Sequence, residues 1–162
     1  RYCAEQHPGC FVEIGCFKGE TTRALALVAG EFGRKVLAVD PWLPDGQSCQ
    51  GGEYELFLEN TKACARHIEV LRASSTDPAT ILRLKSVPIS FAFVDGFHEY
   101  ATCLSDIRSV SHASNVIAVD DVRWSDEVLL AFRKGAWITG RTPIHPNICR
   151  EGYLLPRATS TK

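Results

Sequence analysis

The chain has 162 residues, a length typical of one domain, and we expect residues 1–162 to form a single unit. Its 18 Lys and Arg residues nearly balance its 19 Asp and Glu residues, so the formal net charge is -1. This balance argues against a surface that binds nucleic acid through bulk positive charge. Apolar residues make up 45% of the chain, and no apolar run approaches the roughly 18 residues that a membrane-spanning helix needs. We therefore expect a globular domain with neither nucleic acid nor a membrane among its partners.

Seven cysteines are scattered along the chain, and none of them forms a Cys-x-x-Cys pair. This spacing argues against a zinc knuckle or a thioredoxin-like site. Several of the cysteines lie in apolar stretches, where a free cysteine behaves as a small hydrophobic residue. Reduced thiols are typical of intracellular proteins, so we expect a cytoplasmic location.

Short apolar runs alternate with helical patterns along most of the chain. The apolar runs predict strands over residues 11–14, 35–39, 67–72, 89–94 and 115–119. The helical patterns predict helices over residues 21–29, 53–66, 78–84, 99–110 and 125–134, with Ser125 as the N-cap of the last one. Strands that are apolar on both faces and separated by helices are typical of a parallel sheet covered on both sides. The sequence therefore predicts an α/β fold with a doubly wound, mostly parallel sheet.

Two segments are less regular than the rest. Beyond the last predicted helix, residues 136–139 and 151–155 fit a closing hairpin at the edge of the sheet, interrupted by Pro143 and Pro146. Residues 41–52 form a loop rich in Pro, Gly and polar residues, directly after the second predicted strand. Sheets of this kind bind ligands at the carboxyl ends of their strands, so we expect this loop to contribute to a ligand site.

The first predicted strand leads into a turn that contains Gly15 and Gly19. Glycine allows the backbone to turn sharply and allows a ligand to approach it closely. The second strand ends at Asp40, where a carboxylate can accept hydrogen bonds from both hydroxyls of a ribose. The dinucleotide fingerprint Gly-x-Gly-x-x-Gly is absent, because Phe17 occupies its second glycine position. The pattern favours a nucleotide-like ligand, and a simple strand-to-helix turn remains the alternative.

Three acidic residues also follow predicted strands, namely Asp95 after the fourth strand and Asp120 and Asp121 after the fifth. Neighbouring parallel strands end at the same edge, so we expect these carboxylates to converge. Converging carboxylates raise each other's pKa unless a cation lies between them, and oxygen ligands favour Mg²⁺, Ca²⁺ or Mn²⁺. The residues alone leave a second alternative, in which Asp121 caps the next helix and the other two acids are solvated.

The turn after the first strand resembles a motif of class I S-adenosylmethionine-dependent methyltransferases. Residues 12–19 (VEIGCFKG) are similar to that family's first motif, and Asp40 matches its second-strand acid. The resemblance implies a Rossmann-like sheet of seven strands with a reversed edge strand, and S-adenosyl-L-methionine as cofactor. For Trp42, an aromatic that anchors the loop is an equal alternative to one that flanks the adenine. The residues expected to bind the cofactor are Glu13, Gly15, Phe17, Lys18, Gly19, Asp40, Trp42, Ser74, Ser75 and Asp95.

Residues 95–100 (DGFHEY) resemble the Asp-Gly-x-His-x-Tyr signature of a metal-dependent subfamily. That subfamily includes macrolide-sugar O-methyltransferases and cephalosporin-hydroxylase-like proteins, and the pair at 120–121 is similar to the one in catechol O-methyltransferases. The resemblance implies that Asp95, Asp120 and Asp121 hold Mg²⁺. It also places His98 where catechol-type enzymes carry a catalytic lysine. We therefore expect His98 to act as the general base that takes the proton of the acceptor hydroxyl.

The resemblance covers residues 11–122, and it departs from the catechol-type enzymes at the front end. Those enzymes have helices before the first strand that help to shape the acceptor pocket, whereas only ten residues precede Phe11 here. We therefore expect a methyltransferase domain that lacks these helices.

The function expected from the resemblance is metal-assisted transfer of a methyl group to a hydroxyl of a small-molecule acceptor. One alternative keeps the cofactor but methylates nitrogen or a protein. Another is a non-catalytic relative that binds the cofactor as a regulatory or scaffold subunit. A nicotinamide-dependent oxidoreductase is the least favoured, because the glycine fingerprint is absent. The sequence leaves the identity of the acceptor and the formation of a homo-oligomer open.

Overall fold

The computed structural model describes residues 1–44, 49–146 and 148–157, and within these residues seven strands form one sheet. Its strand order is β3-β2-β1-β4-β5-β7-β6. Strands β1 to β5 pair in parallel, whereas β7 is antiparallel to both of its neighbours. The predicted α/β sheet of seven strands with a reversed strand is confirmed, and β6 lies outside β7 at the edge. The strands are β1 (Cys10–Ile14), β2 (Val36–Val39), β3 (Ile68–Leu71), β4 (Ile89–Val94), β5 (Ile117–Val119), β6 (Thr142–Ile144) and β7 (Gly152–Leu155).

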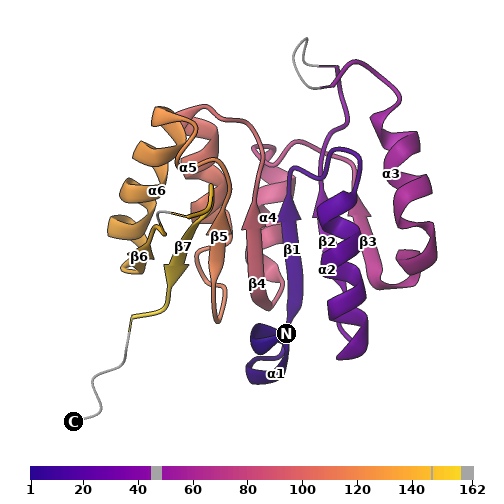
Figure 1. Cartoon of the computed structure of the whole chain (residues 1–162), viewed down its shortest axis with the longest axis horizontal. Coiled ribbons are helices and arrows are strands. Elements are labelled where there is room, and N and C mark those ends of the chain that lie inside the picture. Colours follow the sequence, from indigo (N-terminus) through magenta and orange to yellow (C-terminus); the bar gives the residue numbers. More distant parts are fainter. Residues whose placement is uncertain (45–48, 147, 158–162) are drawn as a thin grey trace.

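Helices cover both faces of the sheet (Figure 1). Successive side chains of a strand point to opposite faces, so Val12 and Ile14 of β1 pack in one core with α4, α5 and α6, and Phe11 packs in a second core with α2. This two-sided burial explains why the strands are continuous apolar runs. None of the helices in the described ranges has the length and the apolar character to cross a bilayer. The helices are α1 (Tyr2–Gln6), α2 (Glu20–Glu31), α3 (Glu53–Thr61), the 3₁₀ helix η1 (Lys62–His67), α4 (Pro78–Ser86), α5 (Tyr100–Ser109) and α6 (Asp126–Thr139).

The short helix α1, which the sequence analysis did not predict, lies at the end of the sheet where β1 begins (Figure 1). The carboxyl ends of the parallel strands point the other way. Helix α1 therefore lies at the end of the sheet opposite to the expected ligand site.

The end of the chain differs from the prediction in one respect. Residues 136–139 are the last turn of α6, so the strand expected there is wrong, and β6 forms the hairpin with β7 instead. The predicted helix ended at residue 134, directly before Gly135, but the helix continues through this glycine, which serves packing: a Cβ on it would lie 2.8 Å from Cγ2 of Ile107 on α5. Pro143 lies within β6, which tolerates it because one side of an edge strand faces away from the sheet. Ser125 caps α6 as predicted, accepting a hydrogen bond from the Val128 N–H at 3.3 Å.

Candidate cofactor and acceptor site

A cavity of about 890 Å³ lies at the carboxyl ends of the central strands. This volume is within the usual range for small-molecule and cofactor sites. Of the predicted site residues, Trp42, Asp120 and Asp121 are not among the described residues that line it. The predicted site residues that do line it are Glu13, Gly15, Phe17, Lys18, Gly19, Asp40, Ser74, Ser75, Asp95 and His98. Pro41, Leu43 and Cys49 of the loop 41–52 also line the cavity, as expected, and residues 45–48 of this loop lie outside the described residues.

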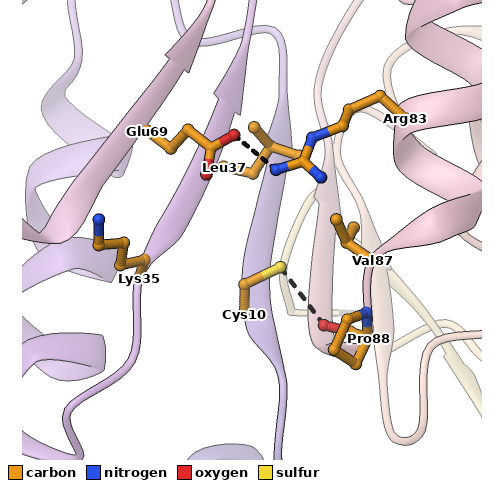
Figure 2. A pocket seen from close by; sticks show the side chains of 7 residues that line it. All are labelled: Cys10, Lys35, Leu37, Glu69, Arg83, Val87 and Pro88. Carbon is orange, nitrogen blue, oxygen red and sulfur yellow. Dashed lines mark hydrogen bonds and ion pairs between the residues drawn. The ribbon is translucent and has the colours of Figure 1, made fainter.

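A second, smaller hollow of about 190 Å³ lies near the amino ends of the strands (Figure 2). In it the Glu69 carboxylate pairs with the Arg83 guanidinium at 2.7 Å, and the Cys10 thiol donates to the Pro88 carbonyl at 3.4 Å. These polar groups are engaged with each other and do not converge on a common point, so this hollow offers no comparable site.

The glycine turn after β1 depends on very close packing. Gly15 has a φ of 85°, and a Cβ on it would lie 2.0 Å from the carbonyl oxygen of Asp95. Gly19 has a φ of 82° and faces the ring of Phe57 on α3, which a Cβ would approach to 2.8 Å. Phe17 has a φ of 45°, in the left-handed region that glycine favours. The turn therefore keeps a glycine-like backbone at the position where the dinucleotide fingerprint would have its second glycine.

The carboxylate of Asp40 holds this turn from the neighbouring strand. Its Oδ2 accepts hydrogen bonds from the N–H groups of Cys16 at 2.8 Å and Phe17 at 2.9 Å, and its Oδ1 accepts one from Trp42 at 2.7 Å. A carboxylate has about four acceptor sites, so Asp40 retains room for about one further donor. The contact with both ribose hydroxyls expected from the sequence exceeds that capacity in this arrangement.

Trp42 lies beneath the turn and outside the cavity lining. Its side chain is 4% exposed, and its Nε1 donates to the carbonyl of Phe17 at 2.7 Å. Its ring packs against Tyr54 and Phe57, each with a centroid separation of 4.8 Å. This geometry fits the loop-anchoring alternative for Trp42 and gives no support to a contact with adenine.

Glu13 on β1 is a buried acid at the floor of the cavity. It is 1% exposed, and the hydroxyl of Thr22 on α2 donates to its Oε2. Burial raises the pKa of Glu13 to about 8. A cationic group of a ligand beside Glu13 would favour its ionised form and would lower that pKa.

A second group of polar side chains converges after β4 and β5. Ligand atoms of Asp95, His98 and Asp121 all lie within 4.8 Å of one another, and Nε2 of His98 is 2.9 Å from Oδ2 of Asp121. Arg150, from the segment before β7, pairs with Oδ1 of Asp121. Burial and the charges of Asp120 and Asp121 raise the pKa of Asp95 to about 7. Carboxylates and an imidazole together suit a divalent cation.

Asp120 is not part of this group. Its Oδ1 accepts a hydrogen bond from the backbone N–H of Asp121 at 2.8 Å. In the predicted set of Asp95, Asp120 and Asp121, His98 therefore replaces Asp120 as the third converging side chain. Asp121 has a φ of 55°, and this left-handed turn brings two consecutive acids into different environments.

The sequence comparison agrees with this geometry. A family model described as a methyltransferase domain matches residues 12–122. This range includes the glycine turn, Asp40 and the acidic group of Asp95, His98 and Asp121. The chain belongs to this methyltransferase family. A search of curated proteins finds no match to the sequence.

Several solved methyltransferases share the fold of this methyltransferase domain. CalS11, a TDP-rhamnose 3'-O-methyltransferase of calicheamicin biosynthesis, aligns with a TM-score of 0.70 and 15% identity over 97% of this chain and 75% of its own. The O-methyltransferase NovP aligns with a TM-score of 0.63 and 18% identity over 95% of this chain and 76% of its own. The SAH-bound Podospora anserina methyltransferase PaMTH1 aligns with a TM-score of 0.67 and 10% identity over 97% of this chain and 75% of its own. At these identities the likeness shows the fold alone.

Two residues of the methyltransferase domain that the sequence analysis did not single out flank the acidic group. Trp124 is 69% exposed, and its ring meets that of His98 edge-on at a centroid separation of 5.3 Å. Arg150 reaches Asp121 from 29 residues further along the chain. The position of Trp124 shortly after the fifth strand could have indicated that it lies near the site. No spacing rule in the sequence links Arg150 to Asp121.

Proposed function

We propose that this methyltransferase domain transfers the methyl group of S-adenosyl-L-methionine to a hydroxyl of a small molecule. The observation that carries the proposal is a single cavity that is lined both by the glycine turn and by the side chains of Asp95 and His98. The O-methyltransferases CalS11 and NovP, which share the fold, support this choice of acceptor group.

The residues of the cavity fit the cofactor. The backbone of Gly15 lines the cavity, Glu13 offers a carboxyl for the cofactor's ammonium group, and Asp40 retains acceptor capacity for a ribose hydroxyl. Ser74 and Ser75 also line the cavity, and we place the adenine beside them. The sulfonium of the bound cofactor supplies an already activated methyl group, so the protein has to align the acceptor and remove its proton.

His98 is the residue we assign to proton removal. Its Nε2 contacts Asp121 at 2.9 Å, and a neutral imidazole that donates from this nitrogen keeps Nδ1 as an acceptor. Asp121, which is almost completely buried, fixes the orientation of the ring. This pair can accept the proton of an acceptor hydroxyl that lies at the same end of the cavity.

We further propose that the carboxylates of Asp95 and Asp121 hold a divalent cation such as Mg²⁺ beside His98, because the ligand atoms of these three residues lie within 4.8 Å of one another. When bound, such a cation lowers the pKa of an acceptor hydroxyl. The ion pair between Arg150 and Asp121 favours a second candidate, a cation-independent transfer in which His98 and Asp121 act alone. Activity that survives exhaustive chelation supports the second candidate, and activity that is lost to EDTA and restored by Mg²⁺ supports the first.

The deciding test of the catalytic assignment is the variant His98→Ala, measured with phenolic and sugar acceptors. We expect kcat to fall by about 10²–10⁴-fold, the usual contribution of a positioned acid–base group. The affinity for S-adenosylhomocysteine should be unchanged, because the cofactor is held mainly by the glycine turn. His112→Ala is the matched control, since His112 contacts the Val87 carbonyl and does not line the cavity. A kcat within a few-fold of the parent would remove His98 from the mechanism.

Cofactor binding without turnover on any acceptor would instead support a regulatory or scaffold role. Turnover on amines or on a protein, but not on hydroxyls, would support the nitrogen- or protein-directed alternative. These outcomes separate the cofactor assignment from the acceptor assignment.

A further inference from the structure

Asp106 on α5 is a fully buried carboxyl group with no evident structural purpose. It is 0% exposed, and neither of its oxygens has a hydrogen bond of normal geometry among the described residues, although the hydroxyl of Ser75 lies close enough to lower the pKa of Asp106. Burial of an unpartnered carboxyl group is unfavourable, so packing alone gives no reason for an acid at this position.

The carboxyl group lies directly behind the wall of the cavity. A Cβ on Gly96 would lie only 3.2 Å from Oδ2 of Asp106, and Gly96 lines the cavity. Ser75 also lines the cavity, and its hydroxyl lies near enough to lower the pKa of Asp106, which burial raises to about 7. Two segments, one after β3 and one after β4, therefore meet in front of the same buried acid.

Ser75 is the side chain through which Asp106 can reach a ligand. A hydroxyl that donates its proton to a carboxyl oxygen keeps its lone pairs free to accept from a group on the other side. With Asp106 behind the wall, the lone pairs of Ser75 are left for a donor in the cavity. Beside Ser75, where we place the adenine, the exocyclic amino group of adenine is such a donor. A 6-oxo purine presents a hydrogen-bond acceptor at the same position.

We propose that Asp106 is a positioning residue that orients the Ser75 hydroxyl and thereby selects a 6-amino purine over a 6-oxo purine. The inference rests on the proposed cofactor site and deepens it. Asp106 does not touch the ligand in this arrangement, so its effect passes through Ser75.

The test compares S-adenosylhomocysteine with its deaminated analogue, S-inosylhomocysteine, by titration calorimetry. We expect the unmodified chain to prefer the adenosyl compound by about 100-fold, because an unmatched acceptor leaves buried polar groups unpaired. Ser75→Ala and Asp106→Ala should each reduce this preference about tenfold, which is the effect of one hydrogen bond. The double variant should lose no more of the preference for the adenosyl compound than Ser75→Ala alone, because both changes remove the same contact.

Ser109→Ala is the matched control, because Ser109 is a buried hydroxyl on the same helix that donates to the Ser105 carbonyl at 2.9 Å, away from the cavity. A merely structural role of Asp106 would change stability but not the ratio of the two affinities. An unchanged ratio in Asp106→Ala, or full additivity with Ser75→Ala, overturns the proposal.

A second measurement covers the case in which Asp106→Ala does not fold. The ¹³C resonance of the Asp106 carboxyl group should shift when S-adenosylhomocysteine binds to the unmodified chain, and should not shift in Ser75→Ala. An equal shift of this resonance in the unmodified chain and in Ser75→Ala would contradict the proposal that Asp106 acts on the ligand through Ser75. Absence of any binding of S-adenosylhomocysteine by the unmodified chain would overturn the proposed function as well, whereas a retained preference in the variants overturns only the role of Asp106.

Discussion

Glu13 has an unusual protonation state because almost no water reaches it, and this has a consequence for stability. Its pKa is about 8 in the folded protein, against an ordinary value of 4.5, so the folded state holds the proton more tightly. The resulting stabilisation is fully present below pH 4.5 and is lost as the pH rises through 8. We expect the free energy of unfolding of the ligand-free protein to fall over this window, by at most about 1.4 kcal/mol per pH unit from Glu13.

Urea unfolding at a series of pH values measures this effect. The variant Glu13→Gln should remove the contribution of Glu13 from the slope, whereas Glu55→Gln, at an exposed position of α3, should leave the slope unchanged. Parallel curves for the unmodified chain and Glu13→Gln would show that the side chain is not a buried, protonated acid.

Individual side chains also show where sequence reasoning reaches its limit. Gly15 and Asp40 were recognisable from their positions, because a glycine directly after the first strand indicates a sharp turn and an acid at the end of the second strand indicates a hydrogen-bond acceptor. The close packing of Gly15 against the backbone of Asp95 is visible only in the structure. The use of the Asp40 oxygens by backbone N–H groups, and the burial of Trp42, depend on how the loop folds back. These details need the three-dimensional structure.

At the scale of elements, the strands were predictable because each is buried on both faces, which produces continuous apolar runs. Helix α6 was predicted too short because its helical pattern weakens after Gly135, and the sequence does not show that Gly135 faces Ile107. The set of converging side chains contains His98 in place of the predicted Asp120, and this difference has a similar origin. It depends on the left-handed backbone at Asp121, which sequence spacing does not reveal.

The packing of α6 on α5 gives a test at this scale. Alanine in place of glycine usually stabilises a helix interior by about 1 kcal/mol. At Gly135 the added Cβ would lie 2.8 Å from Ile107, so we expect Gly135→Ala to destabilise the protein by about 1–3 kcal/mol. The matched control is Gly30→Ala in α2, where the added Cβ would lie 2.7 Å from the ring of His67, a half-buried side chain that can turn away, so we expect a smaller loss of stability there. A gain of stability in both variants, measured by thermal unfolding, would contradict close packing of the two helices.

At the scale of the whole molecule, Arg150 connects the C-terminal hairpin to the ends of the central strands. It contacts Asp121 across 29 residues of sequence, and the cavity itself combines segments that follow β1, β2, β3 and β4. The family motifs indicated which strand ends carry chemistry, because each motif is local in sequence. The position of Arg150 depends on how β7 inserts between β5 and β6, which no local motif encodes.

The contact between Arg150 and Asp121 predicts how the proposed cation site responds to the loss of this arginine. A divalent cation and the guanidinium compete for the same carboxylate, so removal of the guanidinium should favour the cation. We expect Arg150→Gln to bind Mn²⁺ about three- to tenfold more tightly than the unmodified chain, as measured by electron paramagnetic resonance. Arg123→Gln is the control, because it removes the same charge from an exposed position two residues after Asp121 and has no ion pair with that carboxylate among the described residues. Equal tightening in both variants would mean that net charge alone sets the affinity, and weaker binding in Arg150→Gln would mean that the arginine holds Asp121 in place for the cation.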